Sequence, residues 1–182
     1  MMSEELDILK TVTQRLEKAK IPYMITGSIA LNFYAMPRMT RDIDIVIELQ
    51  QGHTKILLDL FQEDFYVDEE TIKEALKNES LFNIIHQQSV FKIDFIIRKN
   101  SPYRELEFQR RQSITLGNAR IWIVSAEDLI LAKLYWARDS FSEMQLQDVK
   151  ALLESAGSLD IDYIKKWVNN LELKEIYEKV KI

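Results

Sequence analysis

The strongest constraint on the fold is a change in the sequence pattern at Ser125. Before this residue, short apolar runs typical of strands alternate with amphipathic segments typical of helices, whereas residues 125–182 carry helical patterns only. Ser125 and Asp128 have the spacing of a capping box, which marks a helix start. We therefore expect an α/β (α+β) fold, with a mixed twisted sheet and flanking helices in residues 1–124. Residues 125–182 are expected to form a C-terminal helical bundle packed on this core.

Local patterns predict the individual elements. Strands are expected where short apolar runs lie between turn residues, over residues 23–26, 43–47, 81–86, 90–97, 113–116 and 120–124. Helices are expected where apolar residues recur at helical spacing, from Ser3 to before Pro22 and over residues 29–34, 52–63, 70–77, 125–138, 142–155, 160–169 and 173–181. The length of 182 residues fits one core domain with a helical appendage.

Composition excludes several classes of site. The chain has no Cys, which excludes disulfides, thiolate nucleophiles, zinc fingers and iron–sulfur clusters. Its two isolated His residues argue against a His-built metal site, so any metal is expected to bind oxygen ligands. With 24 Lys+Arg against 29 Asp+Glu, the net charge of −5 argues against a broad nucleic-acid-binding surface.

The sequence also predicts the compartment. The acidic start, with Glu4 and Glu5, lacks the basic region of a secretory signal peptide. The longest uncharged run, residues 21–37, contains Pro22 and Gly27, so it predicts a strand, a turn and a helix rather than a membrane span. We expect a cytoplasmic protein with no membrane partner.

Three acidic residues lie on apolar strands. Asp42 and Asp44 are two residues apart, so their carboxylates point to one face of the strand. Asp94 lies on the opposite face of its strand from Ile93 and Phe95. If the two strands are neighbours, three carboxylates converge, and their mutual repulsion is best explained by a shared cation. Oxygen ligands favour Mg²⁺ or Mn²⁺, and two such ions about 3.5–4 Å apart would suit phosphoryl transfer.

A turn that suits phosphate precedes these acids. Gly27 and Ser28 lie between a predicted strand and a predicted helix. A small residue lets a phosphate approach the backbone, the N–H groups at a helix start attract an anion, and Ser28 adds a hydroxyl donor. A further cation, Arg41, is placed to steer a triphosphate or to balance the charge of Asp42. Together, the turn and the acids predict a site for a nucleotide and a metal ion.

These residues resemble a known family. Gly27-Ser28, Asp42-Ile43-Asp44 and Asp94 resemble the core motif of the polymerase-β-type nucleotidyltransferase superfamily. A longer set of residues resembles AbiEii-like nucleotidyltransferase toxins of type IV toxin–antitoxin systems, and related uncharacterised nucleotidyltransferase-like proteins. This set comprises Gly27 to Leu31, Tyr34, Arg38 to Asp44, and Asp128 to Lys133. The resemblance covers roughly residues 20–155.

The resemblance implies a nucleotidyltransferase fold and an activity. The reaction would move a nucleoside monophosphate from an NTP to a hydroxyl acceptor and release pyrophosphate. The resemblance to the toxins implies an RNA 3′ end as the acceptor, of tRNA for example, and a protein side chain is equally open. An antitoxin protein is the implied partner. Metal binding is carried over to Asp42, Asp44 and Asp94, and phosphate binding to Gly27 and Ser28.

Two further residues take roles from the resemblance. Lys133 would neutralise the triphosphate, and Asp148 would orient Lys133 or the acceptor. The chain departs from the family pattern in residues 140–147. This segment contains no Lys or Arg where the family has basic residues. This departure favours the alternative of a non-catalytic nucleotidyltransferase-like module that binds a nucleotide or a partner. A metal-dependent phosphohydrolase would use the same acids.

Structural interpretations of the same acids stay open. Asp42 and Asp44 are also explained as a solvated strand end paired with Arg41. Asp94 is also explained by an ion pair with Lys92 on the same strand face.

The residues in the helical region also have structural interpretations. Lys133 is also explained as a lysine that extends to solvent from a packed helix edge, and Asp148 as a solvated acid on an amphipathic helix. The pattern around Trp122, Trp136 and Trp167 predicts packing rather than a base-stacking platform.

Overall fold

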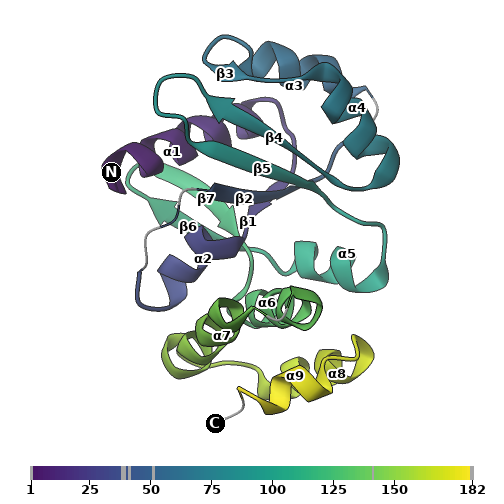
Figure 1. Cartoon of the computed structure of the whole chain (residues 1–182). Helices are drawn as coiled ribbons and strands as arrows, with labels where there is room; N and C mark the ends of the chain where they lie inside the picture. Colours follow the sequence, from purple (N-terminus) through teal and green to yellow (C-terminus); the bar gives the residue numbers. More distant parts are fainter. Residues whose placement is uncertain (1, 38–39, 41, 51, 141, 181–182) are drawn as a thin grey trace.

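The computed structural model describes residues 2–37, 40, 42–50, 52–140 and 142–180. Within this part of the chain, seven strands form one sheet in the order β3-β4-β5-β2-β1-β7-β6 (Figure 1). The strands are β1 (Tyr23–Ile25), β2 (Asp42–Ile47), β3 (Phe65–Tyr66), β4 (Leu81–His86), β5 (Lys92–Ile97), β6 (Gln112–Leu116) and β7 (Ala119–Ile123). The helices are α1 (Met2–Lys18), α2 (Gly27–Tyr34), α3 (His53–Phe61), α4 (Glu69–Asn78), α5 (Pro102–Gln109), α6 (Ala126–Ser140), α7 (Glu143–Ser155), α8 (Ile161–Asn170) and α9 (Lys174–Glu178).

The sheet is mixed, as predicted. β2 pairs in parallel with β5, and β1 pairs in parallel with β7, whereas the other neighbours are antiparallel. The strand that carries Asp42 and Asp44 therefore lies beside the strand that carries Asp94, which confirms the condition set by the sequence. Parallel neighbours need a long crossover, and the chain between β2 and β5 supplies it with α3, α4 and the β3–β4 pair.

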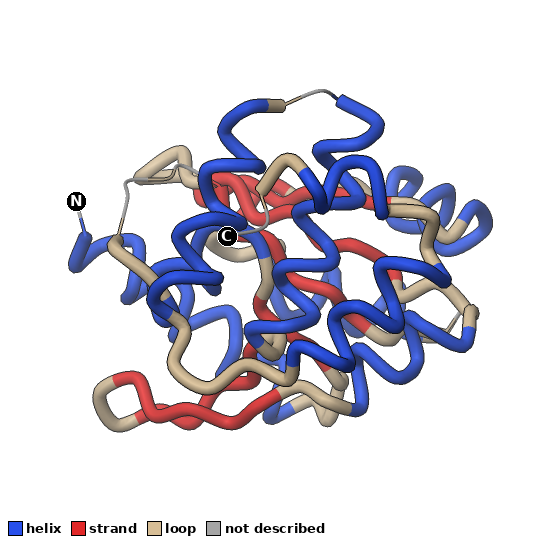
Figure 2. The backbone as a smooth tube through the Cα atoms, turned by 90° about the horizontal axis from the view of Figure 1, so that it is seen from below, coloured by secondary structure: helices blue, strands red, loops and turns tan. Residues whose placement is uncertain are grey.

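Two hydrophobic cores lie on the two faces of the sheet. Alternate residues of β2, Ile43, Ile45 and Ile47, are fully buried in a core shared with α1, α3 and α4. The second core joins Met24 of β1 to α2, α5 and the C-terminal helices. Seen from below, these helices cover that face of the sheet (Figure 2). Asp44 and Asp94 point toward this second face, because side chains alternate along a strand.

The second core contains residues from both sides of residue 124, among them Leu31 of α2 and Leu134 of α6. The division of the chain into a unit of residues 1–124 and a unit of residues 125–182 therefore stays a prediction. The C-terminal helices contribute residues to the same core as Met24 of β1 and Leu31 of α2. No helix among the described residues is both long and apolar enough to cross a bilayer.

Four local expectations are wrong, and the first concerns the two-residue strand β3, which was not predicted. β5 begins at Lys92 rather than at residue 90, because Val90 has a φ of +61° and turns the chain before the strand. α2 begins at Gly27, two residues earlier than expected. Helix α5 was not predicted, although Ser101 caps it by accepting a hydrogen bond from the Arg104 amide and Pro102 occupies its first turn.

Candidate active site

The backbone of β2 and β5 brings two carboxylates together. In the parallel register of these strands, Asp44 is the direct partner of Asp94, and Asp42 is the partner of Lys92. The side chain of Asp94 is 16% exposed and that of Asp42 is 51% exposed. Asp44 and Asp94 thus form the inner pair, and Asp42 lies at the more solvated start of the strand.

The turn after β1 holds Asp44 in place. The amide of Thr26 donates a hydrogen bond to the carbonyl of Asp44 at 2.9 Å. Gly27 follows with a φ of +63°, and a Cβ atom added there would lie 2.7 Å from Cγ of Asp44. Both the backbone conformation and the space therefore require glycine at this position.

The N-terminus of α2 faces the same space. The first N–H groups of a helix have no partner within it, and Thr26 makes no side-chain capping hydrogen bond to them. Gly27 and Ser28 both line the cavity that also contains Asp44. The partial positive charge of a helix start makes this end a suitable place for an anion, although two carboxylates lie nearby.

Lys92 lies between two of the three acids. Its ammonium is 2.9 Å from Oδ2 of Asp94 and 3.7 Å from Oδ1 of Asp42. The hydrogen bond to Asp94 raises the pKa of Lys92. The ion pair expected from the structural interpretation of Asp94 is therefore present, and it involves one of the two oxygens of that carboxylate.

The inner pair of acids has the properties of a cation site. Burial raises the pKa of Asp44, and the charges of Asp94 and Asp42 raise it further. Oδ1 of Asp94 is buried and has no hydrogen-bond partner among the described residues. A buried carboxylate oxygen without a partner is costly, and a divalent cation would satisfy it and relieve the repulsion from Asp44.

The protein itself offers few side chains to bind a metal ion at this site. Within the described part of the chain, no group of three or more His, Cys, Asp or Glu side chains is placed to hold a metal ion. Mg²⁺ in phosphoryl-transfer sites is commonly bound by one or two carboxylates together with substrate phosphates and water. Asp44 and Asp94 fit this arrangement, whereas the role of Asp42 as a third metal ligand stays a prediction.

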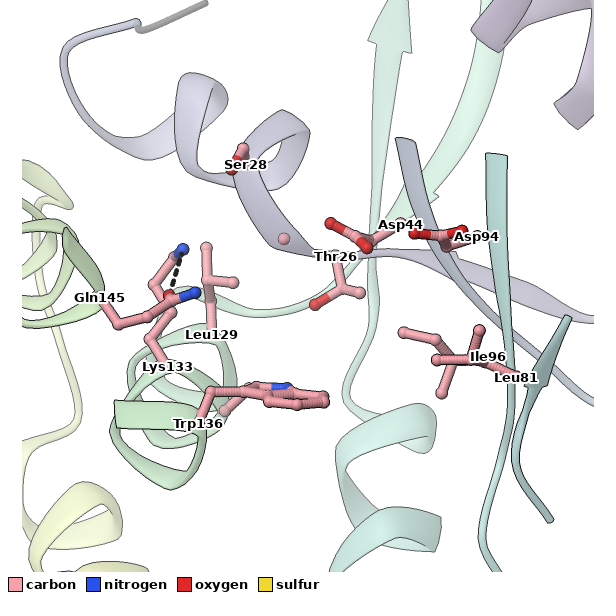
Figure 3. Close-up of a pocket in the computed structure, with 12 residues that line it drawn as sticks. Thr26, Ser28, Asp44, Leu81, Asp94, Ile96, Leu129, Lys133, Trp136 and Gln145 are labelled. Atoms are coloured by element: carbon pink, nitrogen blue, oxygen red, sulfur yellow. Dashed lines mark hydrogen bonds between the residues drawn. The ribbon is translucent and has the colours of Figure 1, made fainter. Parts of the chain in front are cut away.

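Lys133 and Asp148 form a buried pair across α6 and α7. The Lys133 ammonium donates to Oδ2 of Asp148 at 2.7 Å and to Oε1 of Gln145 at 3.1 Å, the latter shown dashed in Figure 3. Lys133 is 4% exposed and Asp148 is 5% exposed. The interpretations of a solvent-directed lysine and a solvated aspartate are therefore wrong. The catalytic roles of both residues stay predictions, and the contact fits the expectation that Asp148 orients Lys133.

A cavity of about 230 Å³ connects these features. Its lining includes Gly27, Ser28, Asp44, Asp94 and Lys133 (Figure 3). The structure thus brings five of the eight predicted site residues to one space, with Asp148 bonded to Lys133 behind it. Asp42 is not part of the lining, and Arg41 lies outside the described residues.

Sequence reasoning missed part of the lining. It comprises Thr26, Leu81, Ile96, Leu129, Ala132, Trp136 and Gln145. Trp136 is 56% exposed and lines the cavity, so its assignment to packing is wrong. Its position three residues after Lys133 was the available signal, since residues i and i+3 share a helix face.

A family model for aminoglycoside-2″-adenylyltransferases matches residues 8–152, which span β1, β2, β5, α6 and most of α7. The chain belongs to this family. Its members are nucleotidyltransferases, which confirms the predicted enzyme class and the predicted superfamily. The narrower resemblance to type IV toxins stays a prediction. No curated protein matches the sequence.

Several solved nucleotidyltransferase structures have the same fold as this chain. The complex of ANT(2″)-Ia with adenylyl-2″-tobramycin has a TM-score of 0.61 at 12% identity, covering 93% of this chain and 99% of that chain. An antigenic nucleotidyltransferase-like protein from Paracoccidioides brasiliensis has a TM-score of 0.59 at 18% identity, covering 99% and 94%. The lincosamide adenylyltransferase LnuA, bound to lincomycin, has a TM-score of 0.53 at 15% identity, covering 79% and 92%. The predicted nucleotidyltransferase fold is confirmed.

Proposed function

We propose that this nucleotidyltransferase moves a nucleoside monophosphate from an NTP to a hydroxyl group of a small molecule, with release of pyrophosphate and with Mg²⁺ or Mn²⁺ as cofactor. The observation that carries the proposal is the position of Asp44. Its carboxylate lies against the glycine that starts α2 on one side and beside Asp94 on the other. A phosphate-binding helix start and an acidic pair thus meet at one side chain.

The start of α2, Lys133 and Arg41 would together bind the triphosphate. The triphosphate would lie at the start of α2, where the backbone N–H groups and the hydroxyl of Ser28 suit phosphate oxygens. Lys133, held by Asp148, would place a positive charge at the same phosphates. Arg41 would add a further cation near the triphosphate. These cations offset the negative charge of the acids around the nucleotide.

The carboxylates would bind the cofactor and the attacking group. Asp44 and Asp94, with Asp42 as the proposed third ligand, would hold the divalent ion, which neutralises charge that develops on the phosphate oxygens. Asp94 would also accept the proton of the acceptor hydroxyl. Its contact with Lys92 would fix the orientation of the carboxylate.

A small-molecule acceptor is supported by two observations. The matching family model is named for transfer to an aminoglycoside. Residues 140–147, which include the end of α6 and the first residues of α7, contain no Lys or Arg to bind an RNA backbone. An RNA 3′ end and an antitoxin partner follow from the toxin resemblance, and a protein hydroxyl is the other acceptor left open; all three stay untested predictions.

The test is pyrophosphate release from each of the four NTPs with Mg²⁺ and a panel of acceptors. The panel contains aminoglycosides, lincosamides, tRNA and a protein substrate mixture. Asp44→Asn and Asp94→Asn are expected to abolish release, whereas Asp59→Asn, an exposed carboxylate on α3, serves as the matched control. Release that survives both site variants contradicts the proposal. Orthophosphate release without an acceptor would indicate a phosphohydrolase instead.

A further inference from the structure

The cavity has an apolar end that phosphate binding does not explain. The indole of Trp136 extends from α6 toward Leu81 of β4 and Ile96 of β5 (Figure 3). Trp136 is 56% exposed and Leu81 is 50% exposed, so both sides of this end present apolar surface to solvent. We name the space between these three side chains the apolar slot.

The apolar slot adjoins the polar end of the same cavity. Lys133 lies one helical turn before Trp136 on α6, and Asp94 precedes Ile96 by two residues on β5, on the same strand face. Trp136 of the slot is thus adjacent to Lys133 of the polar end on α6, and Ile96 of the slot is adjacent to Asp94 of the polar end on β5. A ligand with a charged part at Gly27 and Lys133 and a flat apolar part in the slot would occupy the whole cavity.

We propose that the apolar slot binds the nucleobase of the NTP, which stacks on the indole of Trp136 opposite Leu81 and Ile96. This proposal rests on the proposed function, which places the triphosphate at the start of α2. A nucleobase has an apolar π-face on each side and is joined to its phosphates through one ribose. Stacking of a base on an aromatic side chain tolerates every base, so the slot supplies affinity for NTPs in general.

Other exposed apolar residues do not offer the same site. Tyr66 is 61% exposed on the edge strand β3, and Met144 is 56% exposed at the start of α7, but neither lines the cavity. The acceptor is the weaker candidate for the slot, since its reacting hydroxyl group needs a polar partner that Leu81 and Ile96 do not provide. The position of Trp136 beside Lys133 therefore favours the nucleotide.

The test compares two probes that share the phosphates and differ in the base. ATP and inorganic tripolyphosphate, each with Mg²⁺, are titrated calorimetrically into the wild type, Trp136→Ala and Trp136→Phe. Trp136→Ala is expected to weaken ATP binding about tenfold or more and to leave tripolyphosphate binding unchanged. Trp136→Phe is expected to keep most of the ATP affinity, because a phenyl ring also stacks. Tyr66→Ala removes a similarly exposed aromatic ring that does not line the cavity and serves as the control.

The outcomes separate this inference from the proposed function. Unchanged ATP affinity in Trp136→Ala overturns the stacking role. If the KM for the acceptor increases in that variant while the ATP affinity is unchanged, the slot binds the acceptor instead. An equal loss for ATP and tripolyphosphate also overturns the stacking role, since it would show general disruption of the site. If the wild type binds neither probe, the proposed function fails together with the inference. Melting temperatures of the variants show whether each one is folded.

Discussion

The carboxylate of Asp44 lies against the backbone of Gly27, at the point where β1 passes into α2. The two residues are 17 positions apart in the chain, and the hydrogen bond from the Thr26 amide to the Asp44 carbonyl continues the pairing of β1 with β2 up to Gly27. The helix start proposed for phosphate and the acid proposed for the metal ion therefore have a fixed relative position. Changes to either residue should disturb both functions.

Replacing Gly27 tests this relationship. Gly27→Ala is expected to lose about 1 kcal/mol of stability because its φ is +63°, and about a hundredfold in kcat/KM because the methyl group displaces Asp44. Gly157→Ala is the matched control, with a φ of +75° and no atom within 4 Å of the added Cβ. It should lose similar stability and keep full activity. Equal activity of the two variants would contradict the steric role of Gly27.

Asp44 should reduce stability at neutral pH. Its pKa in the folded state is raised above the ordinary value of 3.8, so the folded protein binds the proton more tightly than the unfolded chain. The contribution of Asp44 to stability is therefore most favourable below the unfolded pKa and declines as pH rises through the folded pKa. Asp44→Asn is expected to raise the melting temperature at pH 7 in the absence of divalent ions and to abolish transfer. A lower melting temperature than that of the wild type would refute this account.

The Lys133–Asp148 pair allows structure and function to be separated. Lys133→Met leaves a buried carboxylate without its cation and is expected to lose about 3 kcal/mol of stability in urea unfolding. Lys133→Met/Asp148→Asn should recover part of this loss, because the uncompensated charge is gone. If Lys133 binds the triphosphate, the double variant stays inactive. If the double variant recovers both stability and activity, Lys133 has a structural role only.

Asp128 is expected to hold the C-terminal helices to the core. It is fully buried and accepts hydrogen bonds from Ser125 at 2.6 Å and from Tyr163 of α8 at 2.7 Å, with Arg110 Nε at 3.1 Å. Asp128→Asn is expected to lose about 2 kcal/mol of stability, since hydrogen bonds to a charged group are lost. Urea unfolding measures the loss, and limited proteolysis should show earlier cleavage near α8. An effect no larger than that of Asp59→Asn would argue against this role.

Local patterns were sufficient for most elements because their causes are local. The alternation in β2 and the capping residue Ser125 each depend on a few consecutive side chains. The elements that the sequence patterns did not predict are those whose pattern covers very few residues. β3 has two residues, and α5 depends on a single Ser-Pro pair at its start. The convergence of Asp44 and Asp94 was predicted only on the condition that their strands are neighbours.

The sequence by itself determined that a metal would need oxygen ligands, that a strand carries Asp42 and Asp44, and that Gly27 lies between a strand and a helix. The tertiary structure decided the pairing of β2 with β5, the burial of Lys133 against Asp148, and the exposure of Trp136 in the cavity. Strand order and helix packing depend on contacts between residues far apart in the chain. A helical pattern shows which residues share a face, but the neighbouring elements decide whether that face meets a core, a buried partner or a cavity.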